Sequence, residues 1–159
     1  MPADGIPSQI IDKIEQAIGL YHRLVLVVAP SGAGKTDALK EVHRHLGAPF
    51  LNVNLEISRR MLDLTVRQRA LQVSRLVEEI LGDSNGEVVL LDNMEILFDP
   101  SLQQDPLRLL LSLSRNRTLV VSWNGEIKNN TLSYGEPGHP EYQRYTVENF
   151  LVITPDAQS

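Results

Sequence analysis

The sequence predicts an α/β fold, in which a parallel sheet of five strands has helices on both of its faces. Short apolar segments alternate with helical patterns, as they do when crossover helices join parallel strands. The segment 29–36 reads Ala-Pro-Ser-Gly-Ala-Gly-Lys-Thr and separates an apolar segment from a helical pattern, which is the context of a phosphate-binding loop. A later apolar segment, 88–92, ends in an aspartate. Together these observations predict the P-loop NTPase fold.

The first half of the chain is expected to contain two strands and three helices. Residues 8–18 have apolar side chains at intervals of three and four, which predicts a helix. Residues 24–29 are apolar throughout, as a strand buried on both faces of a parallel sheet is. A helix is expected over 37–46. Polar and apolar residues alternate over 50–55, which predicts a second strand, and helical spacing returns over 60–81.

The second half begins with the strand that ends in aspartate. A leucine-rich helix is expected over 102–113, and Pro106 within it favours either a kink or a helix that begins there with Asp105 as its cap. The remaining elements are strands over 118–123 and 150–153 and a loop rich in glycine and proline over 125–141. The expected architecture is a minimal AAA+-like core, with no residues left for a helical lid domain.

Composition places the chain among ordinary globular proteins. Its 159 residues are expected to form a single domain, 1–159, with flexible ends at 1–7 and 154–159. A net charge of −5 argues against a global attraction to nucleic acid or membranes. There is no cysteine, which excludes disulfides and thiolate metal sites. The apolar segments are too short to cross a membrane and no signal peptide is evident, so a cytoplasmic location is expected.

The predicted loop has the chemistry to hold the phosphates of a nucleotide. Its inward-pointing N–H groups and the dipole of the next helix favour anions, and Gly32 and Gly34 let the backbone turn. Lys35 would contact the β- and γ-phosphates and take part in catalysis, and Thr36 would offer its hydroxyl to Mg²⁺. The strict motif has glycine where this chain has Ala29. The predicted nucleotide-binding residues are Pro30, Ser31, Gly32, Ala33, Gly34, Lys35 and Thr36.

Asp92 is expected at the carboxyl end of its strand, where parallel sheets bind ligands, and would hold Mg²⁺ beside Thr36. Many P-loop ATPases place a glutamate after this aspartate to polarise the attacking water. This chain has Asn93, whose amide orients water but accepts no proton. Glu95, just beyond, and Glu56, at the end of the predicted neighbouring strand, are candidates for the missing carboxylate. Each is equally compatible with an ordinary surface acid.

Two further features are candidates for nucleotide sensing. Asn124 follows the strand 118–123 and would contact the γ-phosphate; the alternative is a turn formed by Asn-Gly. Arg115 and Arg117 precede that strand. They are either arginine fingers that reach the nucleotide of a neighbouring subunit, which implies a homo-oligomer, or part of a charged loop.

Arginines are concentrated in or beside the predicted helix 60–81. One interpretation is a solvated basic face, and the other is a patch that meets DNA phosphates or an acidic partner. The arginines are Arg59, Arg60, Arg67, Arg69 and Arg75.

Six short segments outside the phosphate loop are distinctive: 52–56 (NVNLE), 91–98 (LDNMEILF), 105–107 (DPL), 114–118 (SRNRT), 123–125 (WNG) and 138–142 (GHPEY). From about residue 21 onward the chain resembles the BrxF family, the small P-loop proteins of type 3 BREX bacteriophage-exclusion systems. The resemblance implies that the Asp-Asn pair at 92–93 is a family trait. It also implies a bacterial cytoplasmic protein that works beside a large ATPase, a DNA methyltransferase, an alkaline-phosphatase-like protein and a helicase.

The sequence therefore leads to two functional hypotheses. The first is an ATP-binding protein, with Mg²⁺ as cofactor and slow or partner-stimulated hydrolysis, that switches assembly of a defence complex. The second is a nucleotide-dependent adaptor without catalysis, which Asn93 favours. A small-molecule kinase is disfavoured because residues 125–141 contain no arginine that could close over the phosphates, and a GTPase because the Asn-Lys-x-Asp signature is absent.

Overall fold

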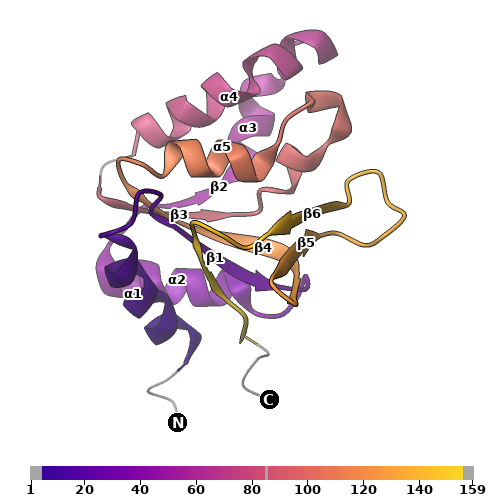
Figure 1. Cartoon of the computed structure of the whole chain (residues 1–159). Helices are drawn as coiled ribbons and strands as arrows, with labels where there is room; N and C mark the ends of the chain where they lie inside the picture. Colours follow the sequence, from indigo (N-terminus) through magenta and orange to yellow (C-terminus); the bar gives the residue numbers. More distant parts are fainter. Residues whose placement is uncertain (1–4, 85, 156–159) are drawn as a thin grey trace.

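A computed structural model describes residues 5–84 and 86–155, so the expectations for residues 1–4 and 156–159 concern residues outside the described structure. A central sheet lies between two layers of helices (Figure 1). The elements in chain order are α1 (Ile6–Ala17), β1 (Leu24–Ala29), α2 (Lys35–Leu46), β2 (Phe50–Asn52), α3 (Val53–Met61), α4 (Val66–Gly82), β3 (Val88–Asp92), the 3-10 helices η2 (Glu95–Phe98) and η3 (Pro100–Leu102), α5 (Pro106–Leu113), β4 (Thr118–Lys128), β5 (Thr131–Tyr134), β6 (Gln143–Thr146) and β7 (Leu151–Ile153).

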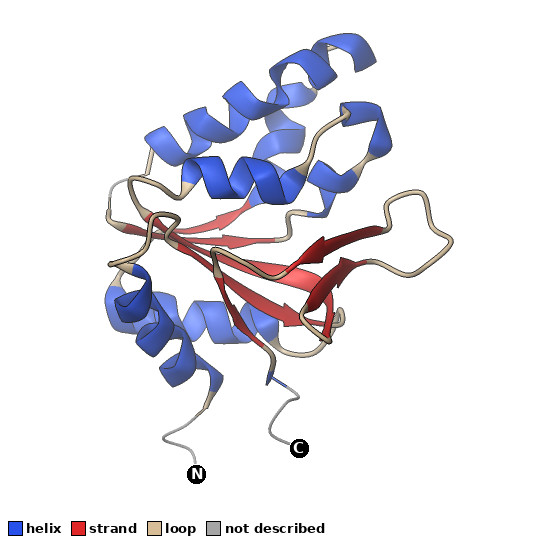
Figure 2. Ribbon diagram, in the orientation of Figure 1, coloured by secondary structure: helices blue, strands red, loops and turns tan. Residues whose placement is uncertain are grey.

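The five strands of the central sheet are parallel and follow the order β2-β3-β4-β1-β7. The predicted α/β fold with a five-stranded parallel sheet is therefore confirmed. Helices α1 and α2 cover one face, and α3, α4 and α5 cover the other (Figure 2). Because the carboxyl ends of parallel strands meet at one edge, the loops after β1, β3 and β4 lie together there.

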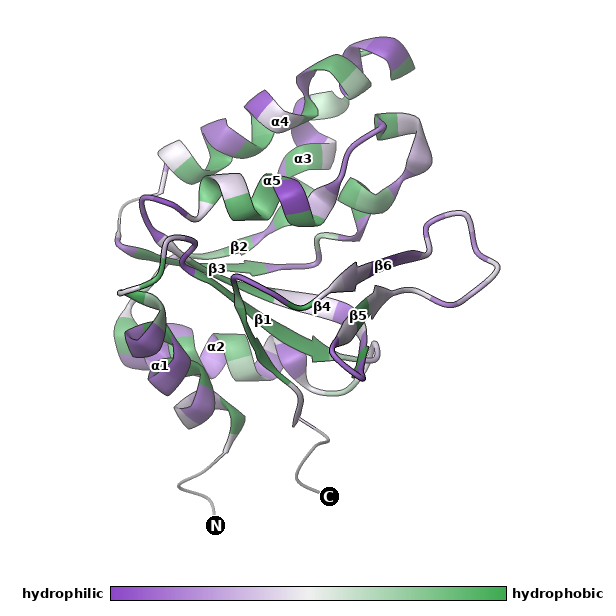
Figure 3. Cartoon of the chain, in the orientation of Figure 1, coloured by the Kyte–Doolittle hydropathy of each residue, from purple (hydrophilic) through white to green (hydrophobic). Residues whose placement is uncertain are grey.

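Alternate side chains of β1 enter two separate cores. Leu24, Leu26 and Val28 pack in the core under α3, α4 and α5, and Val25 and Val27 pack in the core under α1 and α2. All six residues of β1 are buried, which explains why the strand is apolar throughout. The hydropathy colouring shows the same pattern, with hydrophobic central strands and helices that are hydrophobic on one side (Figure 3). No helix among the described residues is long and apolar enough to cross a membrane.

Three predicted boundaries in the first half were wrong. The strand expected over 50–55 ends at Asn52, whose side chain accepts a hydrogen bond from the Leu55 N–H and so starts α3 at once. The helix expected over 60–81 is two helices, because Thr65 and Gln68 form a capping box that starts α4. The helix α1 begins at Ile6, inside the segment 1–7 that was expected to be flexible. Side-chain caps decided the first two boundaries, whereas α1 begins after Gly5 with a proline in its first turn.

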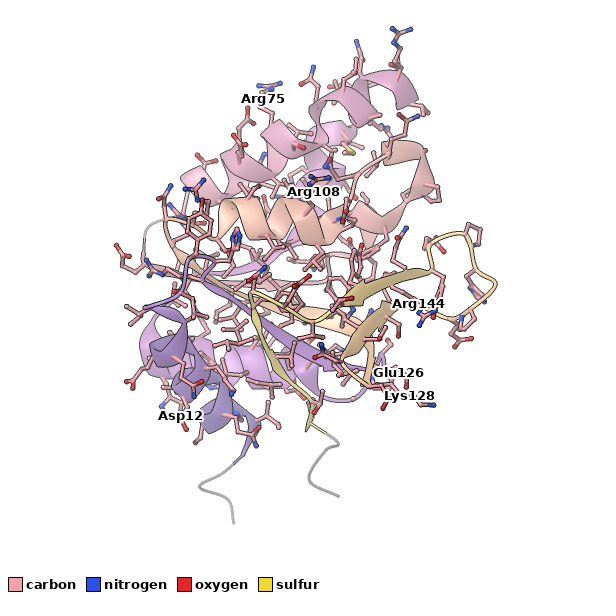
Figure 4. All side chains as sticks on the ribbon, viewed as in Figure 1. Asp12, Arg75, Arg108, Glu126, Lys128 and Arg144 are labelled. Carbon is pink, nitrogen blue, oxygen red and sulfur yellow. The ribbon has the colours of Figure 1, made fainter. Side chains whose placement is uncertain are left out.

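The loop expected over 125–141 was also wrong in part. Strand β4 continues to Lys128 and pairs antiparallel with β5, which pairs with β6. This hairpin extends beyond the central sheet, and Figure 4 shows Glu126, Lys128 and Arg144 on it. Its base is held by aromatic rings: Tyr134 stacks on Phe98, and the edges of both meet Trp123. By contrast, α5 begins at Pro106 with Asp105 as its cap, which was one of the two alternatives.

Gly125 allows β4 and β5 to approach closely where the hairpin leaves the sheet. A Cβ at this position would lie 1.8 Å from the Ser133 carbonyl oxygen. We expect Gly125→Ala to lower the free energy of unfolding by about 2 kcal/mol or more, because backbone atoms cannot yield as a side chain does. Thermal unfolding followed by the fluorescence of Trp123, the one tryptophan, measures this effect.

Gly82→Ala is the matched control, because a Cβ at Gly82 meets nothing within 4 Å. Equal unfolding temperatures for the two variants would contradict the tight packing at Gly125.

Candidate functional site

A cleft of about 350 Å³ lies at the carboxyl edge of the sheet, between the loop after β1 and the ends of β3 and β4. The register explains why these ends meet, since Ala29 pairs with Asn124 and Asn52 with Asp92. The cleft is lined by Ser31, Gly32, Gly34, Lys35, Thr36, Asp37, Asp92, Asn93, Glu95, Ser122 and Asn124. The structure therefore brings most of the predicted site residues into one place.

The loop between β1 and α2 has the backbone of an anion-binding site. Gly32 and Gly34 have φ values of 84° and 90°, in the left-handed region that glycine adopts without strain. The first helical residue, Lys35, is buried, and its Nζ donates to the carbonyl oxygens of Ala29 at 2.9 Å and Pro30 at 2.8 Å. These bonds place the ammonium group across the loop, at the positive end of the α2 dipole. The loop can thus hold several negative charges.

Asp92 joins the loop to the sheet through two hydroxyl groups. The Thr36 hydroxyl donates to Oδ2 of Asp92 at 2.8 Å, and the Ser122 hydroxyl donates to Oδ1 at 2.6 Å. Asp92 is only 2% exposed, so these bonds offset part of the cost of burying its carboxylate. Sequence reasoning missed Ser122, although it lies two residues before Asn124 on the same strand. The alternation of side chains along β4 was the signal that could have identified it.

A second set of bonds surrounds Glu95. Its Oε1 accepts a hydrogen bond from the Asn54 amide at 3.0 Å, and its Oε2 accepts one from the Asn124 amide at 2.8 Å. Burial raises the pKa of Tyr134 above its ordinary value, and the nearby charges of Glu95 and Glu141 add to this effect. Sequence reasoning missed Asn54 because it was placed inside the predicted strand 50–55. The site thus contains one carboxylate besides Asp92 that is held by neighbouring amides.

Glu56 does not lie where the sequence predicted it. It belongs to α3 and not to the end of a strand, and its carboxylate pairs with Arg60 at 2.8 Å and Arg59 at 3.7 Å. It does not line the cleft that contains the phosphate loop. The cap formed by Asn52 ends the strand three residues earlier than the alternation suggested and starts α3, and this turns Glu56 away from the sheet edge.

Arg115 and Arg117 lie before β4, at the edge of the sheet opposite the cleft. The Arg117 guanidinium donates to the Leu81 carbonyl at 2.7 Å, which ties this segment to the end of α4. The Arg115 guanidinium lies 4.4 Å from the centre of the Tyr21 ring. Neither residue can reach the cleft of its own chain, and a contact with a second subunit stays a prediction.

Most of the five arginines near α4 are engaged within the chain. Arg60 pairs with Glu56 and Asp83, Arg75 with Glu79, and Arg69 donates to the Leu64 carbonyl. Arg75 projects outward from α4 (Figure 4). The leucines at 62 and 71 are 74% and 75% exposed on the same segment. Positive charge on this segment is therefore partly neutralised, and exposed apolar side chains accompany it.

Comparison with protein families identifies the family of the chain. The model of the ATPase family associated with various cellular activities (AAA) matches residues 25–121, more than half of the 159-residue chain. Among solved structures, C. elegans PCH-2 is similar to this chain with 16% sequence identity and a TM-score of 0.44; the match covers 94% of this chain and 41% of the PCH-2 chain. The structure of Drosophila ORC bound to DNA is similar with 18% identity and a TM-score of 0.47; the match covers 97% of this chain and 44% of the chain in that structure.

The chain thus spans less than half the length of either of these structures. No curated protein matches the sequence. The family match covers all but the first residue of β1, the phosphate loop and β3, and it ends in β4 at residue 121, just before the cleft residues Ser122 and Asn124. The chain belongs to the AAA family of P-loop ATPases.

Proposed function

We propose that this protein binds ATP with Mg²⁺, hydrolyses it slowly, and acts as a nucleotide-dependent switch. The observation that carries this proposal is the pair of hydroxyl bonds to Asp92, which joins Thr36 of the phosphate loop to the two strands beside it. In P-loop ATPases this hydroxyl and this carboxylate hold the metal, and the lysine contacts the phosphates. The same residue types occupy the same relative places in this cleft.

The donor set at the cleft fits magnesium. Thr36 and Asp92 offer a hydroxyl and a carboxylate oxygen, the hard ligands that Mg²⁺ prefers, and Mg²⁺ usually takes only one or two protein ligands besides phosphates and water. When bound, the ion would neutralise charge on the phosphate oxygens. Lys35 would bind the same phosphates, and Ser122 would hold the Asp92 carboxylate in its orientation.

The nucleotide state can be communicated to the hairpin. Asn124 follows Trp123, whose Nε1 donates to the Ser133 carbonyl of β5 at 3.0 Å. Asn124 therefore links the cleft to the hairpin through one peptide unit. Contact between Asn124 and the γ-phosphate would shift this strand, which is how switch segments respond to nucleotides.

The biological setting is proposed from the resemblance to the BrxF family. On this basis the protein is a bacterial cytoplasmic component of a BREX phage-defence complex, with the large ATPase, the methyltransferase and the phosphatase-like protein as partners. DNA contact through the arginines near α4 and assembly into homo-oligomers belong to the same proposal. Within the described part of the chain, Arg67 is the arginine of that group without an ion pair or hydrogen bond, which makes it the first residue to replace in a DNA-binding assay.

A nucleotide-dependent adaptor without catalysis is the second candidate. Asn93 favours it, because this residue lines the cleft at the position after Asp92 where many P-loop ATPases have glutamate. An amide cannot take the proton of water. Such an adaptor would bind ATP as tightly as the switch does and would differ only in turnover.

Binding and turnover of ATP by the wild-type chain test the proposal. We expect ATP binding that depends on Mg²⁺ and turnover that increases with DNA or the partner proteins. Calorimetry or the fluorescence of Trp123 measures the binding. Absence of ATP binding with and without Mg²⁺ would refute the proposal. Binding without turnover under every condition would establish the adaptor.

A further inference from the structure

We infer that Glu95 supplies the carboxylate that polarises the attacking water, in place of the residue after Asp92. This inference rests on the proposed function, since it concerns the hydrolysis of bound ATP. It also assigns a positioning role to Asn54, which the sequence did not single out.

The backbone after β3 carries Glu95 into the cleft. Asn93 has a φ of 53°, in the left-handed region that asparagine tolerates better than most residues. The 3-10 helix η2 begins two residues later with Glu95, and its last residues, Leu97 and Phe98, are buried. Phe98 also stacks on Tyr134. Glu95 is thus the first residue of a short helix whose other end is fixed in the core, and it lines the same cleft as Lys35.

Two amides fix the orientation of the Glu95 carboxylate. The Asn54 amide donates to one oxygen and the Asn124 amide to the other. The Asn54 side chain cannot be reversed, because its own oxygen accepts the Ile96 N–H at 2.8 Å. Its backbone N–H also donates to the Asn93 carbonyl at 2.7 Å. Asn54 therefore holds both the turn at Asn93 and the carboxylate beyond it.

The carboxylate keeps capacity for a water molecule. Each carboxylate oxygen has two lone pairs, and each oxygen of Glu95 accepts one amide hydrogen bond. A free lone pair can therefore accept a proton of water. The Asn124 amide donates to the same carboxylate, and the sequence predicts that Asn124 lies near the γ-phosphate. Water held by Glu95 would therefore lie near that phosphate.

The other candidate carboxylates have different surroundings. Glu56 is paired with Arg60 in α3 and does not line the cleft. Asp37 lines the cleft, but it is exposed in the first turn of α2, where an acidic side chain stabilises the positive end of the helix. Asp92 is buried and accepts both hydroxyl groups. Glu95 is the cleft carboxylate that is held by amides and left with an open acceptor site.

The proposed step balances as an ordinary hydrolysis. The oxygen of water forms a bond to the γ-phosphorus, and the bond between that phosphorus and the β–γ bridging oxygen breaks. The electron pair of the broken bond leaves with ADP. The proton of water passes to Glu95 and from there to solvent, which returns the carboxylate to its starting state.

Glu95→Gln is the primary test. Glutamine preserves the size of the side chain but accepts no proton, so we expect steady-state turnover to fall roughly 100-fold or more, as removal of a general base does. ATP affinity should stay within about threefold of the wild type, because the phosphate loop is unchanged. The matched control is Glu126→Gln, an exposed carboxylate on the same sheet edge outside the cleft, which should retain wild-type turnover.

Two more variants separate catalysis from positioning. Asn93→Glu combined with Glu95→Gln places a carboxylate directly after Asp92, and we expect it to restore part of the turnover. Asn54→Ala should lower kcat about tenfold with KM unchanged, because a misplaced carboxylate slows the chemical step without weakening binding. Loss of the bond to the Ile96 N–H should also lower the melting temperature slightly. A merely structural role of Asn54 would lower the melting temperature and leave kcat unchanged at temperatures where the protein is folded.

The outcomes distinguish this inference from the proposed function. Wild-type turnover in Glu95→Gln, or a loss of turnover in Glu56→Gln instead, would overturn the assignment of Glu95 while leaving the ATPase intact. Absence of turnover in the wild type with DNA and partner proteins present would overturn both. Loss of ATP binding in Glu95→Gln would also refute the assignment, because it would show that Glu95 holds the nucleotide.

Discussion

Replacing Lys35 by alanine is expected to abolish ATP binding. The Lys35 ammonium group is buried at the mouth of the phosphate loop, where it donates to the carbonyl oxygens of Ala29 and Pro30. Phosphate oxygens would replace or join these acceptors, and each charge-assisted hydrogen bond contributes about 1.5–3 kcal/mol. Loss of contacts to two phosphates therefore predicts a fall in affinity of roughly 100-fold or more. Calorimetric titration with ATP measures this directly.

Lys40→Ala is the control for this variant. Lys40 lies on the same helix, α2, and is exposed to solvent, so its removal changes the net charge by the same amount without touching the loop. We expect its ATP affinity to match the wild type. Unchanged affinity in Lys35→Ala would refute the phosphate loop as the nucleotide site.

Replacing Asp92 by asparagine is expected to remove the magnesium dependence of both binding and turnover. Asparagine has the same shape and can still bond to the hydroxyl groups of Thr36 and Ser122, so the fold should persist. It lacks the negative charge that Mg²⁺ requires. Because a metal contributes several kcal/mol to the stabilisation of the transition state, turnover should fall roughly 100-fold or more. ATP affinity measured with EDTA should stay close to that of the wild type.

Ser122→Ala is the comparison for Asp92→Asn. It removes one hydroxyl donor at 2.6 Å from Asp92 but keeps the charge. We therefore expect a smaller loss of turnover and a retained dependence on Mg²⁺. A full response to Mg²⁺ in Asp92→Asn would show that Asp92 is not the metal ligand, and the ligand would then have to be sought elsewhere in the cleft.

The residue after Asp92, Asn93, has a backbone role. Its amide cannot replace a glutamate chemically, but its tolerance of a φ of 53° lets the chain turn sharply after β3. We infer that Asn93 forms the turn and that the carboxylate of Glu95, two residues later, polarises the water. An asparagine after Asp92 is therefore compatible with ATP hydrolysis.

Much of the fold follows from local sequence patterns. The strand β1 was predicted with its observed bounds, because six consecutive buried residues form a purely apolar segment. The phosphate loop and Asp92 were found because each depends on a short motif beside a buried strand. The strand order, with β4 between β1 and β3, brings these two motifs together, and it required pairing of distant segments.

Only the tertiary structure decided which polar residues share the cleft. Glu56 and Glu95 were equivalent candidates in the sequence, and the helix cap at Asn52 separated them by turning Glu56 into α3. Asn54 and Ser122 carry no motif, and their roles arise from bonds to residues 41 and 30 positions away. The hairpin after Asn124 was expected to be a loop, because its glycines and prolines are typical of loops. Its strands pair nevertheless, and the packing of Tyr134 on Trp123 stabilises them. Motifs set by one segment can be predicted from sequence, whereas contacts between distant segments depend on how the whole chain packs.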